Sequence, residues 1–74
     1  MRTEILDPYG IKIIDANPYY VANKLDHYKA RVKGDFVVFP KWDFMPDVLI
    51  WLNVNNIACG NIIKISPKIY KQIT

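Results

Sequence analysis

Apolar side chains recur with the period of an α-helix between residues 18 and 33. The recurring positions are spaced at i, i+4, i+7 and i+11, so they form one stripe along a helix. Its four members are Val21, Leu25, Tyr28 and Val32. Asn17 and Pro18 suit the start of a helix, and Gly34 suits a left-handed end. The pattern predicts a helix over residues 18–33.

Four other segments have the composition of β-strands. Residues 36–39 are apolar on both faces, which is typical of a central strand covered from both sides. Residues 62–66 predict a last strand. The short apolar runs 3–6 and 11–15 are separated by the sequence Asp-Pro-Tyr-Gly, whose residue types favour a type I turn. These two runs predict an N-terminal β-hairpin.

Residues 48–54 have two interpretations. Asp43 can cap a helix there, Pro46 fits its first turn, and Asn56 can end it in the left-handed conformation. The alternative is a strand followed by a hairpin turn at Asn55 and Asn56. We favour the helix.

These elements predict a small α+β or α/β domain that occupies residues 1–74, in the order strand, strand, helix, strand, helix, strand. A chain of 74 residues has room for one core only. Right-handed crossovers make the last three strands parallel and place both helices on one face of the sheet. We therefore expect a two-layer sandwich whose mixed sheet carries an antiparallel N-terminal hairpin.

The second face of that sheet is also apolar in this interpretation. Isoleucines point both ways in residues 11–15 and 62–66, and an exposed apolar face usually marks an interaction site. Ser66 and Pro67 open either a short C-terminal helix or an extended tail. Residues 67–74 can fold back over the face, or a partner can cover it; the sequence leaves both alternatives open.

Composition excludes several classes of protein. Hydrophobic residues make up 51% and charged residues 23% of the chain, which is a globular balance. Cys59 is the only cysteine, so we expect no internal disulfide and a cytoplasmic location. One histidine and one cysteine cannot close a zinc site, and no cofactor motif occurs, so we expect neither metal nor cofactor. No apolar run approaches the roughly 20 residues of a membrane-spanning helix, so we expect no membrane contact.

Two basic regions are candidate nucleic-acid contacts, since the formal net charge is +3. The first is one flank of the helix predicted over residues 18–33, where an aromatic residue lies among cations. Its members are Tyr20, Lys24, His27 and Arg31. The second is the C-terminal segment, which has no acidic residue after Asp47 and carries Lys64, Lys68 and Lys71.

The densest aromatic segment lies where a predicted strand leads into a helix, a common position for ligand or partner contacts. Its candidate partner-binding residues are Phe39, Lys41, Trp42 and Phe44. Catalysis has weaker support. His27 and Cys59 can be imagined as base and nucleophile, but no third residue to orient the base is evident, so we expect no enzyme activity.

The sequence therefore predicts a small, non-enzymatic protein-binding module that contacts another protein, or a second copy of itself, through the apolar sheet face and residues 39–44. Ile, Lys, Asn and Tyr are abundant and have AT-rich codons, which is typical of AT-rich bacterial, phage or mobile-element genomes. We therefore expect a phage-like or mobile-element protein that inhibits a larger host protein or complex. The alternative is a weak, sequence-tolerant nucleic-acid-binding protein that uses the two basic regions.

Overall fold

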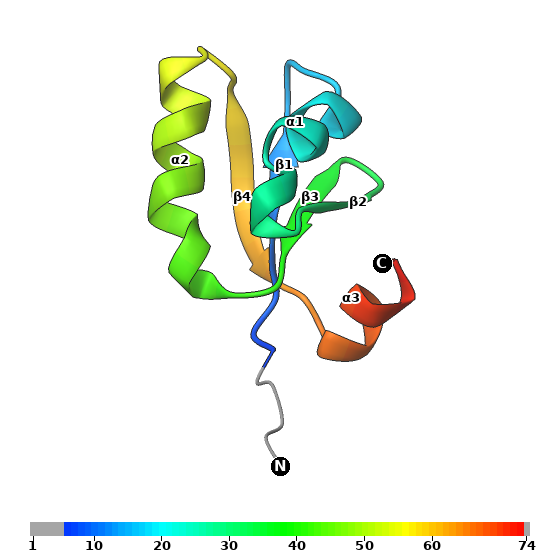
Figure 1. Cartoon of the computed structure of the whole chain (residues 1–74). Coiled ribbons are helices and arrows are strands. Elements are labelled where there is room, and N and C mark those ends of the chain that lie inside the picture. Colours follow the sequence, from blue (N-terminus) through cyan, green and yellow to red (C-terminus); the bar gives the residue numbers. More distant parts are fainter. Residues whose placement is uncertain (1–5, 74) are drawn as a thin grey trace.

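The computed structural model describes residues 6–73 as a four-stranded antiparallel sheet with three α-helices (Figure 1). The strands are β1 (Tyr9–Ile13), β2 (Arg31–Lys33), β3 (Phe36–Phe39) and β4 (Cys59–Lys64), arranged in the order β2-β3-β1-β4. The helices are α1 (Pro18–Lys24), α2 (Met45–Val54) and α3 (Pro67–Gln72), and two short 3-10 helices are η1 (Asp26–Tyr28) and η2 (Trp42–Phe44). The prediction of a small α+β domain is confirmed.

The connectivity consists of two interlocked β-α-β units. The path from β1 through α1 to β2 skips over β3, and the path from β3 through α2 to β4 skips over β1. This split β-α-β arrangement is the connectivity of ferredoxin-like folds. Because many unrelated functions occur on one connectivity, the arrangement by itself implies none of them.

The prediction of a mixed sheet was wrong, since every neighbouring pair of strands is antiparallel. The cause is β2, a strand that lies within the segment predicted as the end of a helix. Lys33 pairs with Phe36 across a two-residue turn at Gly34 and Asp35, and Gly34 has φ +60°. Glycine therefore adopts the left-handed conformation as predicted, but it serves a hairpin. The extra strand reverses the direction of β3.

The first helix begins as predicted and ends nine residues early, at Lys24 and not at residue 33. Asn17 caps it by accepting a 2.8 Å hydrogen bond from the Tyr19 amide. After Leu25 the chain forms η1, and Lys29 takes φ 62°, which turns it into β2. Val32 pairs with Val37 in the sheet, so β-pairing replaces the last helical turn.

The predicted N-terminal turn is absent from residues 7–10. Asp7 donates a backbone hydrogen bond to the Pro40 carbonyl and the Pro8 carbonyl accepts one from Ile65, each at 2.9 Å. These bonds continue the pairing of β1 with both neighbouring strands, and Tyr9 and Gly10 already belong to β1. Residues 3–5 of the predicted hairpin lie outside the described part of the chain, and Leu6 is in no strand.

The second helix confirms the favoured interpretation of residues 48–54. Pro46 lies in its first turn, whereas Asp43 belongs to η2 and does not cap it. Asn56 has φ 58°, and the Ile57 amide donates a 3.0 Å bond to the Leu52 carbonyl, which closes the end of the helix.

Both long helices cover one face of the sheet, as predicted. The core between them and the sheet contains Ile11, Ile13, Val21, Leu25, Val37, Phe39, Met45, Val48 and Leu52. Within residues 6–73, no helix combines the length and the apolar character needed to cross a membrane.

The C-terminal segment forms a helix, and this helix covers one end of the second sheet face. Ser66 caps α3 by accepting a 3.2 Å bond from the Lys68 amide. Tyr70 packs with Val38 and Ile65, which are buried and lie on the side of the sheet opposite α1 and α2. Ile69 and Ile73 join this smaller core. In Figure 1, α3 (red) accordingly lies well apart from α2.

Candidate functional site

The predicted aromatic segment divides between core and surface. Phe39 is completely buried in the main core and offers no surface to a partner, and Phe44 is half-buried with its ring 5.2 Å from that of Tyr28. Trp42 is 47% exposed, and its ring meets the Tyr9 ring edge-on at 4.7 Å. Lys41 is half-buried just before η2. Trp42 is therefore the residue of this segment best placed for a partner.

Lys64 lies beside the Trp42 and Tyr9 pair. Its Nζ is 3.0 Å from the Asp7 carboxylate and 5.7 Å from the centre of the Tyr9 ring. The hydrogen bond that Lys64 donates to the Asp7 carboxylate, and then the negative charge of Asp7, raise the pKa of Lys64 above its ordinary value. This lysine, predicted as a nucleic-acid contact, already has an anionic neighbour within the fold.

The predicted basic flank is not one helical stripe, because the helix that would carry it ends at Lys24. Tyr20 and Lys24 remain neighbours on α1, with the Lys24 Nζ 5.7 Å from the ring centre. His27 lies in η1, where its ring is 4.0 Å from that of Tyr28.

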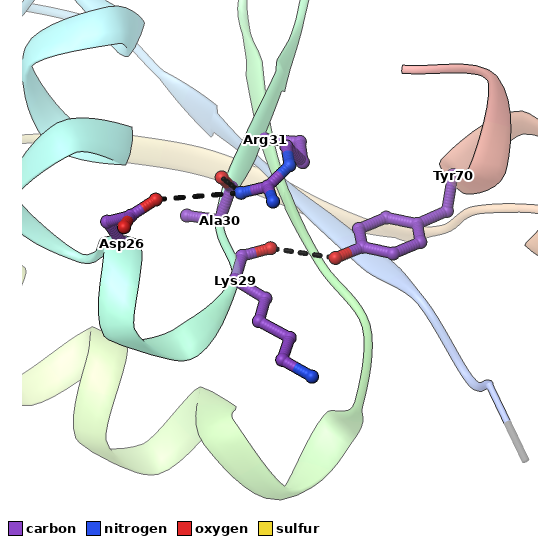
Figure 2. Close-up of polar contacts among 5 residues, drawn as sticks. All are labelled: Asp26, Lys29, Ala30, Arg31 and Tyr70. Carbon is purple, nitrogen blue, oxygen red and sulfur yellow. Dashed lines mark hydrogen bonds and ion pairs between the residues drawn. The ribbon is translucent and has the colours of Figure 1, made fainter. Parts of the chain in front are cut away.

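Arg31 opens β2 and is bound to its own surroundings. Its guanidinium lies 3.6 Å from the Asp26 carboxylate, and its Nη1 donates a 2.7 Å hydrogen bond to the Ala30 carbonyl. Figure 2 shows Arg31 between these two partners. Lys68 and Lys71 are exposed on α3. The structure therefore distributes the predicted basic residues over α1, η1, β2, β4 and α3.

A groove between η1 and α2 was not predicted from the sequence. The groove has a volume of about 470 Å³. We call it the α2 groove; its lining residues are Leu25, His27, Tyr28, Asp47, Ile50, Trp51 and Val54. Leu25 is buried and forms part of the floor, while Ile50 and Val54 lie one turn apart on α2.

The rim of the α2 groove exposes large apolar side chains. Ile50 is 62% and Val54 is 71% exposed, and Trp51 between them is half-buried. Asp47, in the first turn, is the only charged residue of α2. A surface helix normally presents a charged or polar outer face to water, so this outer face is unusual. The signal was present in the sequence: within the run 48–54 only Asn53 is polar, so no side of a helix there could be strongly polar.

Tyr28 and Asp47 bridge the two walls of the groove. The Tyr28 hydroxyl donates a 3.4 Å hydrogen bond to the Asp47 carboxylate. Burial, then the negative charge of Asp47 and this hydrogen bond, raise the pKa of the Tyr28 phenol above its ordinary value. The contact joins η1 to the start of α2 and so holds one end of the groove together.

The two residues considered for catalysis lie in different elements. Cys59 opens β4 and is half-buried against the main core, and His27 is in η1. Among residues 6–73, no hydrogen bond joins them, and no group of three or more His, Cys, Asp or Glu side chains is arranged to hold a metal ion.

Comparisons with known proteins find no matching protein-family model, no similar curated protein and no similar solved structure.

Proposed function

We propose that this protein is a non-enzymatic protein-binding module and that the α2 groove receives the partner. The single observation that supports the proposal most is the exposure of Ile50 and Val54 beside Trp51 on a helix with almost no charge. Contiguous exposed apolar surface on a soluble domain usually marks an interaction site. Aromatic residues dominate the energy of protein interfaces, and the groove contributes Tyr28 and Trp51 to such a contact.

The partner we expect is apolar in character. Burying one exposed Ile or Val side chain contributes about 1.5–3 kcal/mol when its whole surface leaves water. A partner that inserts an apolar side chain between Tyr28 and Ile50 would cover both walls of the groove. Trp42 lies in η2, directly before α2, and we include its exposed ring in the proposed contact.

A module of this size would act by occupying a surface on a larger protein, and residues 6–73 contain no evident catalytic group. An inhibitor of a host protein or complex, encoded by a phage or mobile element, is the role we propose within this class. The codon-linked bias toward Ile, Lys, Asn and Tyr supports it.

Site-specific photo-crosslinking tests the proposal. A photoreactive phenylalanine analogue replaces Ile50 in one variant and Asn61, exposed on β4, in the control variant. We expect one discrete crosslinked protein from position 50 and none from position 61, and loss of that product when Val54→Lys is added. Equal crosslinking from both positions, or a product insensitive to Val54→Lys, would contradict a partner in the groove.

A second copy of the chain is the other occupant that the groove could accept. Sedimentation equilibrium of the purified protein distinguishes the two. A monomer that crosslinks only to a different protein supports the proposed module. A dimer that Ile50→Lys converts to a monomer shows that the groove is a self-association surface.

A further inference from the structure

The second sheet face contains a row of three side chains that none of the preceding surfaces includes. Lys33 of β2 is the direct cross-strand partner of Phe36 in β3, and Phe36 is the direct partner of Lys12 in β1. Directly paired residues of antiparallel strands point to the same face. The adjacent residues Val37 and Ile11 lie in the main core, so this row points away from α1 and α2.

The row remains open because α3 covers only the other end of this face. A hollow of about 360 Å³ lies over it, bounded by Lys12, Lys33, Phe36, Ile63 and the turn at Gly34 and Asp35. Ile63 is 40% exposed there. The Phe36 ring leans over Gly10 on the neighbouring strand, where its Cδ2 lies 3.5 Å from the position that a Cβ would occupy. A side chain at Gly10 would therefore meet the ring.

The charges of the hollow are mainly positive. Lys12 and Lys33 are exposed, and neither forms an ion pair with any residue between 6 and 73. Among residues 6–73, Asp35, on the turn, is the one carboxylate that lines the hollow. Arg31, next along the same face of β2, is already paired with Asp26.

We propose that this row binds single-stranded nucleic acid, with one base stacked on Phe36 and phosphates held by Lys33 and Lys12. Neighbouring strands are about 4.7–4.9 Å apart, so the two lysines stand roughly 9–10 Å apart on either side of the ring. Their flexible side chains can reach phosphates on both sides of a stacked base. An aromatic platform between cations is the combination that sequence-tolerant single-strand binding uses. An acidic peptide would satisfy the lysines but would leave the ring without a partner.

This surface is independent of the α2 groove, because the two lie on opposite faces of the sheet. A partner in the groove does not obstruct the row. Failure of either proposal therefore leaves the other unaffected.

Fluorescence anisotropy with labelled oligo-thymidylate and oligo-uridylate, at about 50 and 200 mM salt, tests the proposal. The test variant is the double substitution Lys12→Gln/Lys33→Gln. Its matched control is Lys29→Gln/Lys41→Gln, which removes the same charge from the turn before β2 and from the residue before η2. We expect the test variant to raise Kd at the lower salt about tenfold or more. We also expect it to reduce the salt slope by about 1.4, because two single-strand phosphate contacts are lost. The control should change both quantities much less.

Phe36→Leu separates stacking from charge. The substitution removes the ring but leaves an apolar, uncharged side chain. We expect Kd to rise about tenfold and the salt slope to stay unchanged. If circular dichroism shows that Phe36→Leu does not fold, the lysine variants alone test the proposal. Absence of binding by the unsubstituted protein at the lower salt would overturn the proposal. Equal losses in the test and control variants, or full competition by polyglutamate with no effect of Phe36→Leu, would also overturn it.

Discussion

The Tyr70 hydroxyl donates a 2.8 Å hydrogen bond to the carbonyl oxygen of Lys29, 41 residues earlier in the chain (Figure 2). Lys29 has φ 62°, a conformation that residues other than glycine rarely adopt, and it turns η1 into β2. Tyr70 is only 6% exposed and packs on Val38. The contact therefore joins the C-terminal helix both to the second sheet face and to the turn that starts β2.

Tyr70→Phe should destabilise the protein by about 1 kcal/mol, because it leaves the part-buried Lys29 carbonyl without this donor while the ring still packs. In a domain of this size the melting temperature should fall by about 4–8 °C for each kcal/mol. Tyr19→Phe is the matched control, since Tyr19 is 70% exposed. Equal melting temperatures for the two variants would show that the bond contributes nothing to stability.

Gly34→Ala should lower the free energy of unfolding by about 1 kcal/mol. No atom lies within 4 Å of the position that its Cβ would take, so the effect is conformational and comes from φ +60° alone. Urea denaturation measures it. Asp35, at the other turn position, has no positive φ, so Asp35→Ala should lower the free energy of unfolding less. A larger loss for Asp35→Ala than for Gly34→Ala would contradict the role of the positive φ at Gly34.

Stability should fall at alkaline pH partly through Tyr28. Its pKa is raised in the folded protein, so the folded state favours the neutral phenol. This stabilising contribution is complete below the unfolded pKa of about 10 and is lost as the pH rises through the higher folded value. The raised pKa of Lys64 acts in the same direction, because its charged form is favoured in the fold.

Urea midpoints between about pH 8 and pH 11 measure this loss. We expect the midpoint of Tyr28→Phe to fall less steeply over this interval than that of the unsubstituted protein, since the substituted ring cannot ionise. Tyr19→Phe again serves as the control and should follow the unsubstituted protein. Parallel curves for all three proteins would refute the role of Tyr28.

Trp42→Ala should weaken binding of the partner identified by crosslinking by more than about 1 kcal/mol, as expected for an exposed aromatic residue in an interface. Its ring contacts Tyr9 on the protein surface, so the fold should persist. Titration calorimetry gives the affinity and circular dichroism monitors the fold. Unchanged affinity in a folded variant would exclude Trp42 from the interface.

Local sequence patterns were sufficient for those elements whose ends are encoded by neighbouring residues. Asn17 and Pro18 start α1, and Pro46 with the apolar run 48–54 favoured the helix α2 over a strand. At Ser66 and Pro67 the sequence left a helix and an extended tail open, and the structure has the helix, α3. The apolar residues of β3 similarly predicted a strand covered on both faces. In each case a side chain, or a run of apolar side chains, acts on backbone only a few residues away.

Tertiary contacts decided the rest of the fold. Val21, Leu25, Tyr28 and Val32 have helical spacing, yet Val32 is in β2 because pairing with Val37 satisfies its backbone within the sheet. The residue types of Asp7 and Pro8 favour a turn, but hydrogen bonds with Pro40 and Ile65 continue the pairing of β1 there. Such bonds join residues that are far apart in the chain, so the local spacing of residues does not predict them.

The same division applies to the candidate sites. The sequence by itself determined which residues are aromatic, basic or apolar, and it identified Trp42 and the apolar second sheet face as surfaces of interest. Only the tertiary structure buried Phe39, ended the basic flank at Lys24 and brought Lys12, Phe36 and Lys33 into one row. The physical reason is that strand register sets which distant side chains become neighbours, and register depends on the whole sheet.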